Sequence, residues 1–169
     1  MKKISIIGAL FVLLIGSLLH FTYDLSDGNT FISFISPINE SLWEHFKLGF
    51  YSFLLYGLIV YKFVKSKAHN YWFALGLSPI ILNIIIYLLY STYTHFTDKS
   101  IFWIDIAIYT FAILVAFFIF YKLTTLPPLP HFTQWIGFIL IVLMITAFIF
   151  FTLNPPNQFD IFVDPTKSQ

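Results

Sequence analysis

Residues 135–153 read WIGFILIVLMITAFIFFTL, and no side chain in this stretch is charged. A helix needs about 20 predominantly apolar residues to cross the roughly 30 Å hydrocarbon core of a bilayer. The stretch therefore predicts a membrane-spanning helix. Similar apolar stretches predict four more spans, over residues 4–20, 37–64, 71–90 and 101–121.

Composition supports the same fold class. The 169 residues are 59% hydrophobic and only 10% charged, whereas a soluble domain carries about 25% charged residues. We expect an all-α, polytopic membrane helix bundle with one domain over residues 1–153, in contact with membrane lipids. A loosely ordered external tail, residues 154–169, should follow. The absence of cysteine excludes disulfides and thiolate metal sites. A net charge of +1 without a basic patch speaks against nucleic-acid binding.

Lysine positions predict how the spans are oriented, because cytoplasmic loops carry an excess of basic residues. A cytoplasmic N-terminus places six lysines inside and three outside; the inner ones are Lys2, Lys3, Lys62, Lys65, Lys67 and Lys122, and the outer ones are Lys47, Lys99 and Lys167. The first span has the basic start of a signal peptide but no A-x-A-like cleavage site after it. We therefore expect it to be retained as a helix, with the C-terminus external.

All basic residues are lysines, and isoleucine, phenylalanine and asparagine are abundant. This bias is typical of AT-rich bacterial genomes. We therefore expect the chain in a bacterial cytoplasmic membrane.

The outer side of the predicted bundle carries most of the acids and histidines. Residues 36–46 read SPINESLWEHF, and a serine-proline pair is typical of a helix start. With the second helix beginning near Pro37, Glu40 and Glu44 would lie four residues apart on one face. His45 would point elsewhere and is only an alternative ligand. The same pattern also fits a capped helix whose acids do nothing further.

A second candidate group lies at the outer end of the first span. His20 and Asp24 are four residues apart and share a face if the helix continues. Together with Glu40 and Glu44 they would offer imidazole and carboxylate ligands, which suit zinc, manganese or iron. A polar cap on a helix that leaves the membrane is the alternative interpretation.

Asp105 is an acidic residue inside the fourth predicted span. It lies about four residues, or roughly 6 Å, below the outer end of the fourth span. An ionisable side chain in a span costs about 2.5–3.5 kcal/mol on insertion scales and generally has a partner or a role. Asp105 either belongs to a hydrogen-bonded knot between helices or lines a polar chamber that opens outward.

Three motifs together resemble an uncharacterised family of small bacterial multi-pass proteins. They are HFTYDLSDGN (20–29), SPINESLWEHFKL (36–48) and TYTHFTDKSIFWIDI (92–106). The resemblance covers roughly the first 115 residues and implies a multi-pass fold and the positions of the motifs, but no reaction. His95 departs from the pattern, since the family more often has glycine there.

Three functions follow from these residues. The first is metal-assisted or acid–base catalysis on a lipid or lipid-linked substrate at the outer leaflet, with His20, Asp24, Glu40, Glu44 and Asp105 as the candidate residues. The second is a non-catalytic accessory or structural protein, with a membrane-protein partner, in which these residues cap and pack helices. The third is a small cation-binding or transport protein. The sequence alone leaves all three open.

Overall fold

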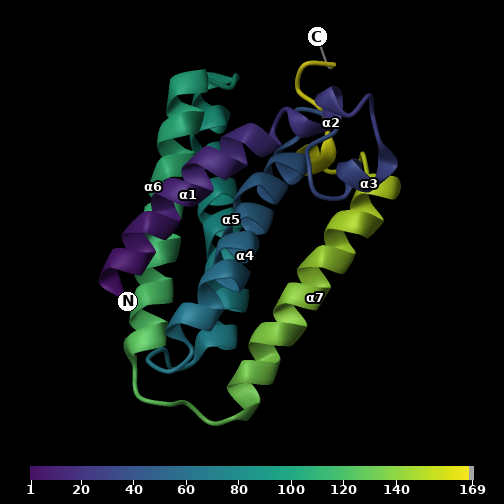
Figure 1. Ribbon diagram of the computed structural model, residues 1–169. Coiled ribbons are helices and arrows are strands. Elements are labelled where there is room, and N and C mark those ends of the chain that lie inside the picture. Colours follow the sequence, from purple (N-terminus) through teal and green to yellow (C-terminus); the bar gives the residue numbers. More distant parts are fainter. Residues whose placement is uncertain (168–169) are drawn as a thin grey trace.

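The structure, a computed structural model, describes residues 1–167. Within this range the regular secondary structure is all helical (Figure 1). The long helices are α1 (Lys2–Leu19), α4 (Leu42–Val64), α5 (Tyr71–Thr97), α6 (Phe102–Thr125) and α7 (Phe132–Leu153). The short ones are α2 (Thr22–Leu25), α3 (Thr30–Ser33) and the 3-10 helix η1 (Asp160–Phe162). Each of the five long helices is long and apolar enough to cross a membrane. The predicted fold class is therefore confirmed.

The two central helices are α4 and α5, with α1 and α6 on one side and α7 on the other (Figure 1). Helices α1, α5 and α7 end at the same side of the bundle, where α4 and α6 begin. We call this side the polar end; α2, α3 and η1 also gather there (Figure 1). The short connections from α4 to α5 and from α6 to α7 lie at the opposite end.

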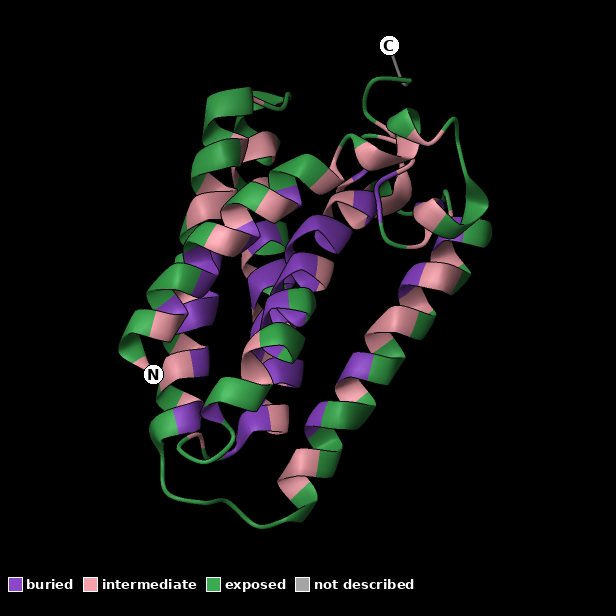
Figure 2. Ribbon diagram, viewed as in Figure 1, coloured by how far each residue is buried: buried purple, intermediate pink, exposed green. Residues whose placement is uncertain are grey.

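The distribution of buried and exposed residues over the helices is the one expected of a helix bundle in a membrane. Buried residues concentrate on α4 and on the facing side of α5, while the outward sides of α1, α6 and α7 are exposed and apolar (Figure 2). Phe50 and Phe53 on α4 are fully buried, and Phe53 stacks on Phe117 of α6 with ring centroids 4.3 Å apart. In a bilayer the exposed apolar sides face lipid tails, so their exposure costs nothing there.

Helix α7 joins the bundle through one close backbone approach to α5. A Cβ atom added to Gly76 would lie 2.2 Å from the carbonyl oxygen of Gly137, and one added to Gly137 would lie 2.1 Å from that of Trp72. Small residues let membrane helices approach in this way. These two glycines therefore set the separation between α5 and α7.

The second span begins later than predicted: α4 starts at Leu42, not near Pro37. Ser41 is its N-cap, and its hydroxyl accepts a hydrogen bond from the Glu44 N–H. The hydroxyl of Ser36 is used elsewhere, because it donates to the Leu19 carbonyl at 2.7 Å and accepts from the Tyr23 N–H. The earlier serine thus joins the loop to α1, and the later one starts the helix.

The tail packs against the bundle and is not loosely ordered as expected. Phe162 in η1 lies against Trp43 of α4 with ring centroids 5.0 Å apart, and it also contacts Phe151 of α7. Aromatic packing of this kind holds an otherwise irregular segment in place. Residues 168–169 of the predicted tail lie outside the described residues.

Candidate functional site

Three side chains from separate segments converge at the polar end. His20 follows the last residue of α1, Glu40 lies in the loop before α4, and His45 lies in the first turns of α4. The Nε2 atoms of the two imidazoles are 3.2 Å apart. Nε2 of His20 lies 3.7 Å from Oε1 of Glu40, and Nε2 of His45 lies 3.4 Å from Oε2. One ligand atom from each of these residues lies within 4.8 Å of the others.

The backbone fixes the orientation of the His45 ring. Its Nδ1 atom lies 2.9 Å from the carbonyl oxygen of Ser41. A carbonyl oxygen can only accept, so Nδ1 carries a proton and donates it. In the imidazolium form Nε2 also carries a proton and donates it to Glu40, and in the neutral ring Nε2 presents a lone pair toward His20 and Glu40. A backbone carbonyl that holds one ring nitrogen is the usual support of a histidine that binds a metal with the other.

Electrostatics favour an ionised Glu40 and a neutral His20. The hydrogen bond with His45 lowers the pKa of Glu40, and charge interactions with both imidazoles add to the effect against its partial burial. Burial, followed by the proximity of His45, lowers the pKa of His20, although Glu40 and Asp24 oppose this. A carboxylate and a neutral imidazole are the forms that bind metal ions.

Two of the predicted site acids surround the cluster without entering it. Asp24 lies outside the three-residue group but interacts electrostatically with His20. Asp105 interacts with His45 in the same way. Asp105 itself accepts hydrogen bonds from the hydroxyls of Tyr93 on α5 and of Ser100 just before α6. Because α6 begins at Phe102, Asp105 lies in the first turn of its helix, where a negative charge is favourable.

Glu44 does not share a site with Glu40, and the prediction that they occupy one helix face is wrong. Glu40 precedes the helix, whereas Glu44 points into the interior and forms an ion pair with Lys47. Both of these side chains are buried. The prediction failed because it assumed that the helix begins five residues too early, and so gave Glu40 a helical geometry that it does not have.

His45 is the member of the cluster that the sequence analysis gave only as an alternative ligand. With α4 beginning at Leu42, the loop is free to bring Glu40 back over the first turn, next to the His45 ring. The sequence did contain a signal for the later start of α4. Ser41 and Glu44 have the S-x-x-E spacing of a capping box, which predicts a helix start at Ser41.

A contact with the tail completes the surroundings. The backbone N–H of Glu40 donates to the carboxylate of Asp164. The acid that faces the two histidines is therefore held both by the loop before α4 and by the folded-back tail.

The comparisons with known proteins identify the family. A family model described as "Family of unknown function (DUF6512)" matches residues 1–169. The chain belongs to this family, in agreement with the resemblance to an uncharacterised family. No curated protein and no solved structure matches the chain.

Proposed function

We propose that this chain, as a member of the DUF6512 family, binds one divalent metal ion through His20, Glu40 and His45 and uses it for hydrolysis at the outer face of a bacterial cytoplasmic membrane. The substrate is a lipid or a lipid-linked molecule. Two imidazoles and one carboxylate form a ligand set found in catalytic zinc sites and in non-haem iron sites.

The spacing of the ligand atoms carries the proposal. Zinc binds histidine nitrogen and carboxylate oxygen at about 2.0–2.2 Å in a tetrahedral arrangement, which places neighbouring ligand atoms about 3.3–3.6 Å apart. The two imidazole Nε2 atoms are 3.2 Å apart and lie 3.7 and 3.4 Å from different oxygens of Glu40, and one ligand atom from each of the three residues lies within 4.8 Å of the others. Three such atoms leave one tetrahedral position open, which is the mark of a catalytic rather than a structural zinc site.

The direction of the lone pairs supports a cation between these atoms. With Nδ1 of His45 donating to Ser41, the Nε2 lone pair of the neutral ring faces a carboxylate oxygen of Glu40. Two acceptors at 3.4 Å repel one another unless a proton or a metal ion lies between them. The negative charges of Asp24 and Asp105, which both act on the imidazoles, favour a cation at this point.

The chemistry follows from the ligand set. A zinc ion held here would lower the pKa of a bound water to about 7 and so supply hydroxide near neutral pH. Each oxygen of Glu40 faces one imidazole, so the oxygen that does not bind the ion can accept a proton from the incoming water. Hydrolysis adds that water across the cleaved bond: the hydroxyl joins the electrophilic atom and the proton joins the leaving oxygen. No further reactant is needed.

The position of the cluster supports a substrate in the membrane. It lies where three candidate spans end and two begin, beside the loop that carries α2 and α3. In that loop Leu25 and Phe31 are 81% and 80% exposed, and such side chains insert into the interfacial region of a bilayer. The lysine distribution of the sequence supports an outer-leaflet position for this end. Asp105 accepts hydrogen bonds from Tyr93 and Ser100 at the start of α6, so this acid does not mark a transport path through the bundle.

The experiment is metal analysis of the purified full chain in detergent. After chelation and removal of the chelator, the protein is titrated with zinc, manganese and iron(II), and bound metal is counted. We expect one ion per chain, and its loss in His20→Ala, His45→Ala and Glu40→Gln. His131→Ala, an exposed histidine at the opposite end, is the matched control and should bind normally.

Two results would overturn the proposal. The first is a folded wild-type protein that takes up no metal at micromolar concentration. The second is a His131→Ala variant that loses as much metal as His45→Ala. Catalysis is then tested with the metal-loaded protein in a bacterial lipid extract, where release of a water-soluble product must depend on His45.

A further inference from the structure

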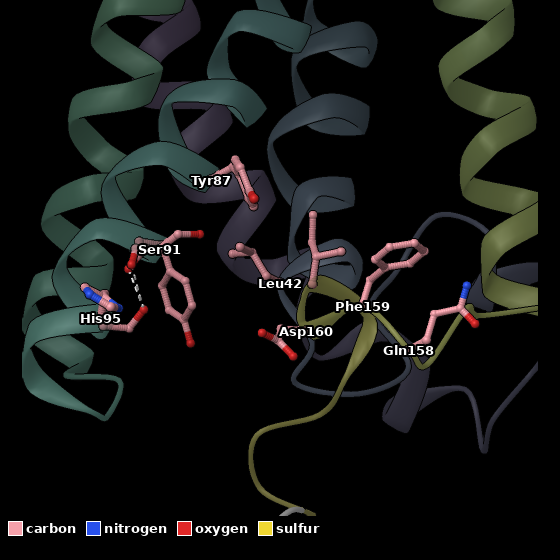
Figure 3. A pocket seen from close by; sticks show the side chains of 10 residues that line it. Leu42, Tyr87, Ser91, His95, Gln158, Phe159 and Asp160 are labelled. Atoms are coloured by element: carbon pink, nitrogen blue, oxygen red, sulfur yellow. Dashed lines mark hydrogen bonds between the residues drawn. The ribbon is translucent and has the colours of Figure 1, made fainter.

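A groove beside the proposed metal centre separates the outer part of α5 from the tail. It encloses about 680 Å³, within the range of about 300–1,000 Å³ usual for ligand pockets. One wall is formed by Tyr87, Tyr90 and their neighbours on α5, and the other by residues 158–161 of the tail (Figure 3). Leu42, at the start of α4, lies between them (Figure 3).

The charge of the groove favours a cation. Of the described residues that line it, Asp160 carries a negative charge, His95 is the one basic side chain, and none is a lysine. Asp160 is exposed, and its side chain lies between the two walls (Figure 3). Asp105 adds to the negative potential, since it interacts electrostatically with Tyr90. An anionic group would be repelled here, whereas an ammonium group would find a counter-charge.

The aromatic side chains that line the groove also favour an ammonium group. Tyr87 and Phe159 are 44% and 56% exposed and flank the groove from opposite walls. Aromatic faces attract alkylammonium cations, and aromatic rings beside a carboxylate recognise choline-like groups. Ordinary apolar contact would explain the rings, but not their combination with Asp160.

The groove continues toward the metal ligands. A smaller recess shares Leu42, Tyr90 and Asp160 with it and adds Val163 and Pro165. These last two residues flank Asp164, whose carboxylate accepts the hydrogen bond from Glu40. The tail segment that forms a wall of the groove is thus the segment that touches a metal ligand.

We propose that the groove binds the ammonium headgroup of a zwitterionic phospholipid, with Asp160 as counter-charge, while the phosphate of the same lipid reaches the metal centre. This inference rests on the proposed function, because it names the substrate of the same centre. Both charges of the lipid are matched: the ammonium group meets Asp160, and the phosphate meets the cation held by His20, Glu40 and His45.

The test uses the full chain in detergent with equimolar phosphatidylcholine and phosphatidylglycerol of identical chains, and counts bound lipids by native mass spectrometry. We expect about tenfold preference for phosphatidylcholine. Asp160→Asn, which keeps the shape and removes the charge, should abolish the preference, and Tyr87→Leu should reduce it. Asp27→Asn removes an equally exposed acid that does not line the groove, and should leave the preference unchanged.

Metal content, measured on the same samples, separates this inference from the proposed function. Bound metal with equal binding of the two lipids overturns the groove inference alone. A phosphatidylcholine preference that Asp160→Asn abolishes, in protein that binds no metal, supports the groove and overturns the metal centre. A preference that survives Asp160→Asn also overturns the groove inference.

Discussion

The Nζ atom of Lys47 lies 2.5 Å from Oε2 of Glu44 in the interior of the protein, where the two side chains are 0% and 4% exposed. The ammonium group also donates to the carbonyl oxygen of Ser33 at 2.7 Å. Glu44 accepts from the Ile38 N–H and from the Thr152 hydroxyl of α7. The pair therefore fastens the loop that carries Glu40 to two helices.

Removing one member of this pair should destabilise the protein strongly. Lys47→Met leaves the Glu44 carboxylate buried without its counter-charge, so we expect a loss of about 3–5 kcal/mol in the free energy of unfolding. The double variant Lys47→Met/Glu44→Leu removes both charges and should recover most of that loss. Chemical denaturation in detergent measures both. Equal losses in the single and double variants would contradict this account.

The N-cap of α4 can be tested by substitution. Ser41→Ala removes the acceptor of the Glu44 N–H bond and should cost about 1 kcal/mol, whereas Ser41→Asp keeps an acceptor and should cost less. Thermal unfolding compares the two. If α4 began at Pro37 instead, Ser41 would lie within the helix and the aspartate would give no advantage over alanine.

The close approach of α5 and α7 should not tolerate a side chain. In Gly137→Leu the added atoms meet the Trp72 backbone, which cannot move aside as a side chain would. We expect a loss of about 1–3 kcal/mol or more, or a separation of α7 visible as faster proteolysis of the 126–131 connection. Ala107→Leu, on an exposed side of α6, also introduces a leucine side chain and should be neutral.

Asn70 holds the connection between α6 and α7. Its buried amide donates to the carbonyl oxygens of Leu123 and Pro127 and accepts from the Leu129 N–H, and its backbone has a φ of 52°. Asn70→Gly keeps that conformation and loses only the hydrogen bonds, at about 1–3 kcal/mol. Asn70→Ala adds backbone strain and should be worse by about 1 kcal/mol. Denaturation that ranks alanine as the milder change would contradict this.

Metal removal should lower thermal stability if the three-residue cluster binds an ion. A ligand at 100 times its dissociation constant stabilises the folded state by about 2.7 kcal/mol. The metal-loaded and chelated wild-type proteins should therefore unfold at different temperatures. The His45→Ala variant should unfold at the same temperature whether metal has been added or removed by chelation. A shift of equal size in His45→Ala would place the ion elsewhere.

The sequence was sufficient to predict the helix bundle, because the hydropathy of a segment is the sum of contributions from its own residues. Each of the five spans contains a long apolar run, and no distant contact is needed to recognise it. The candidate site could not be predicted in this way, because it depends on contacts between separate segments of the chain. His20 and Glu40 were among the predicted ligands, but their partner His45 was predicted only as an alternative ligand. Whether Glu40 can reach the His45 ring depends on where α4 begins.

Two serines, Ser36 and Ser41, have local sequence patterns typical of the N-cap of α4, and these patterns alone do not show which one is the N-cap. Ser36 precedes a proline, and Ser41 lies three residues before Glu44, so both have the features of an N-cap. The choice is made by tertiary contacts: Ser36 bonds to α1, and Glu44 is drawn inward by Lys47. The role of the tail had no local signal, since the contacts of Phe162 and Asp164 lie far away in sequence.

The bond between Thr152 and Glu44 joins residues 108 positions apart, and this has a consequence for biosynthesis. While the ribosome delivers the first four long helices, Glu44 and the loop before α4 lack their contact with α7. The polar end can close only after the last span has entered the bilayer and the tail has crossed to the same side. We therefore expect nascent chains that stop at residue 130 to display an open polar end, accessible to protease.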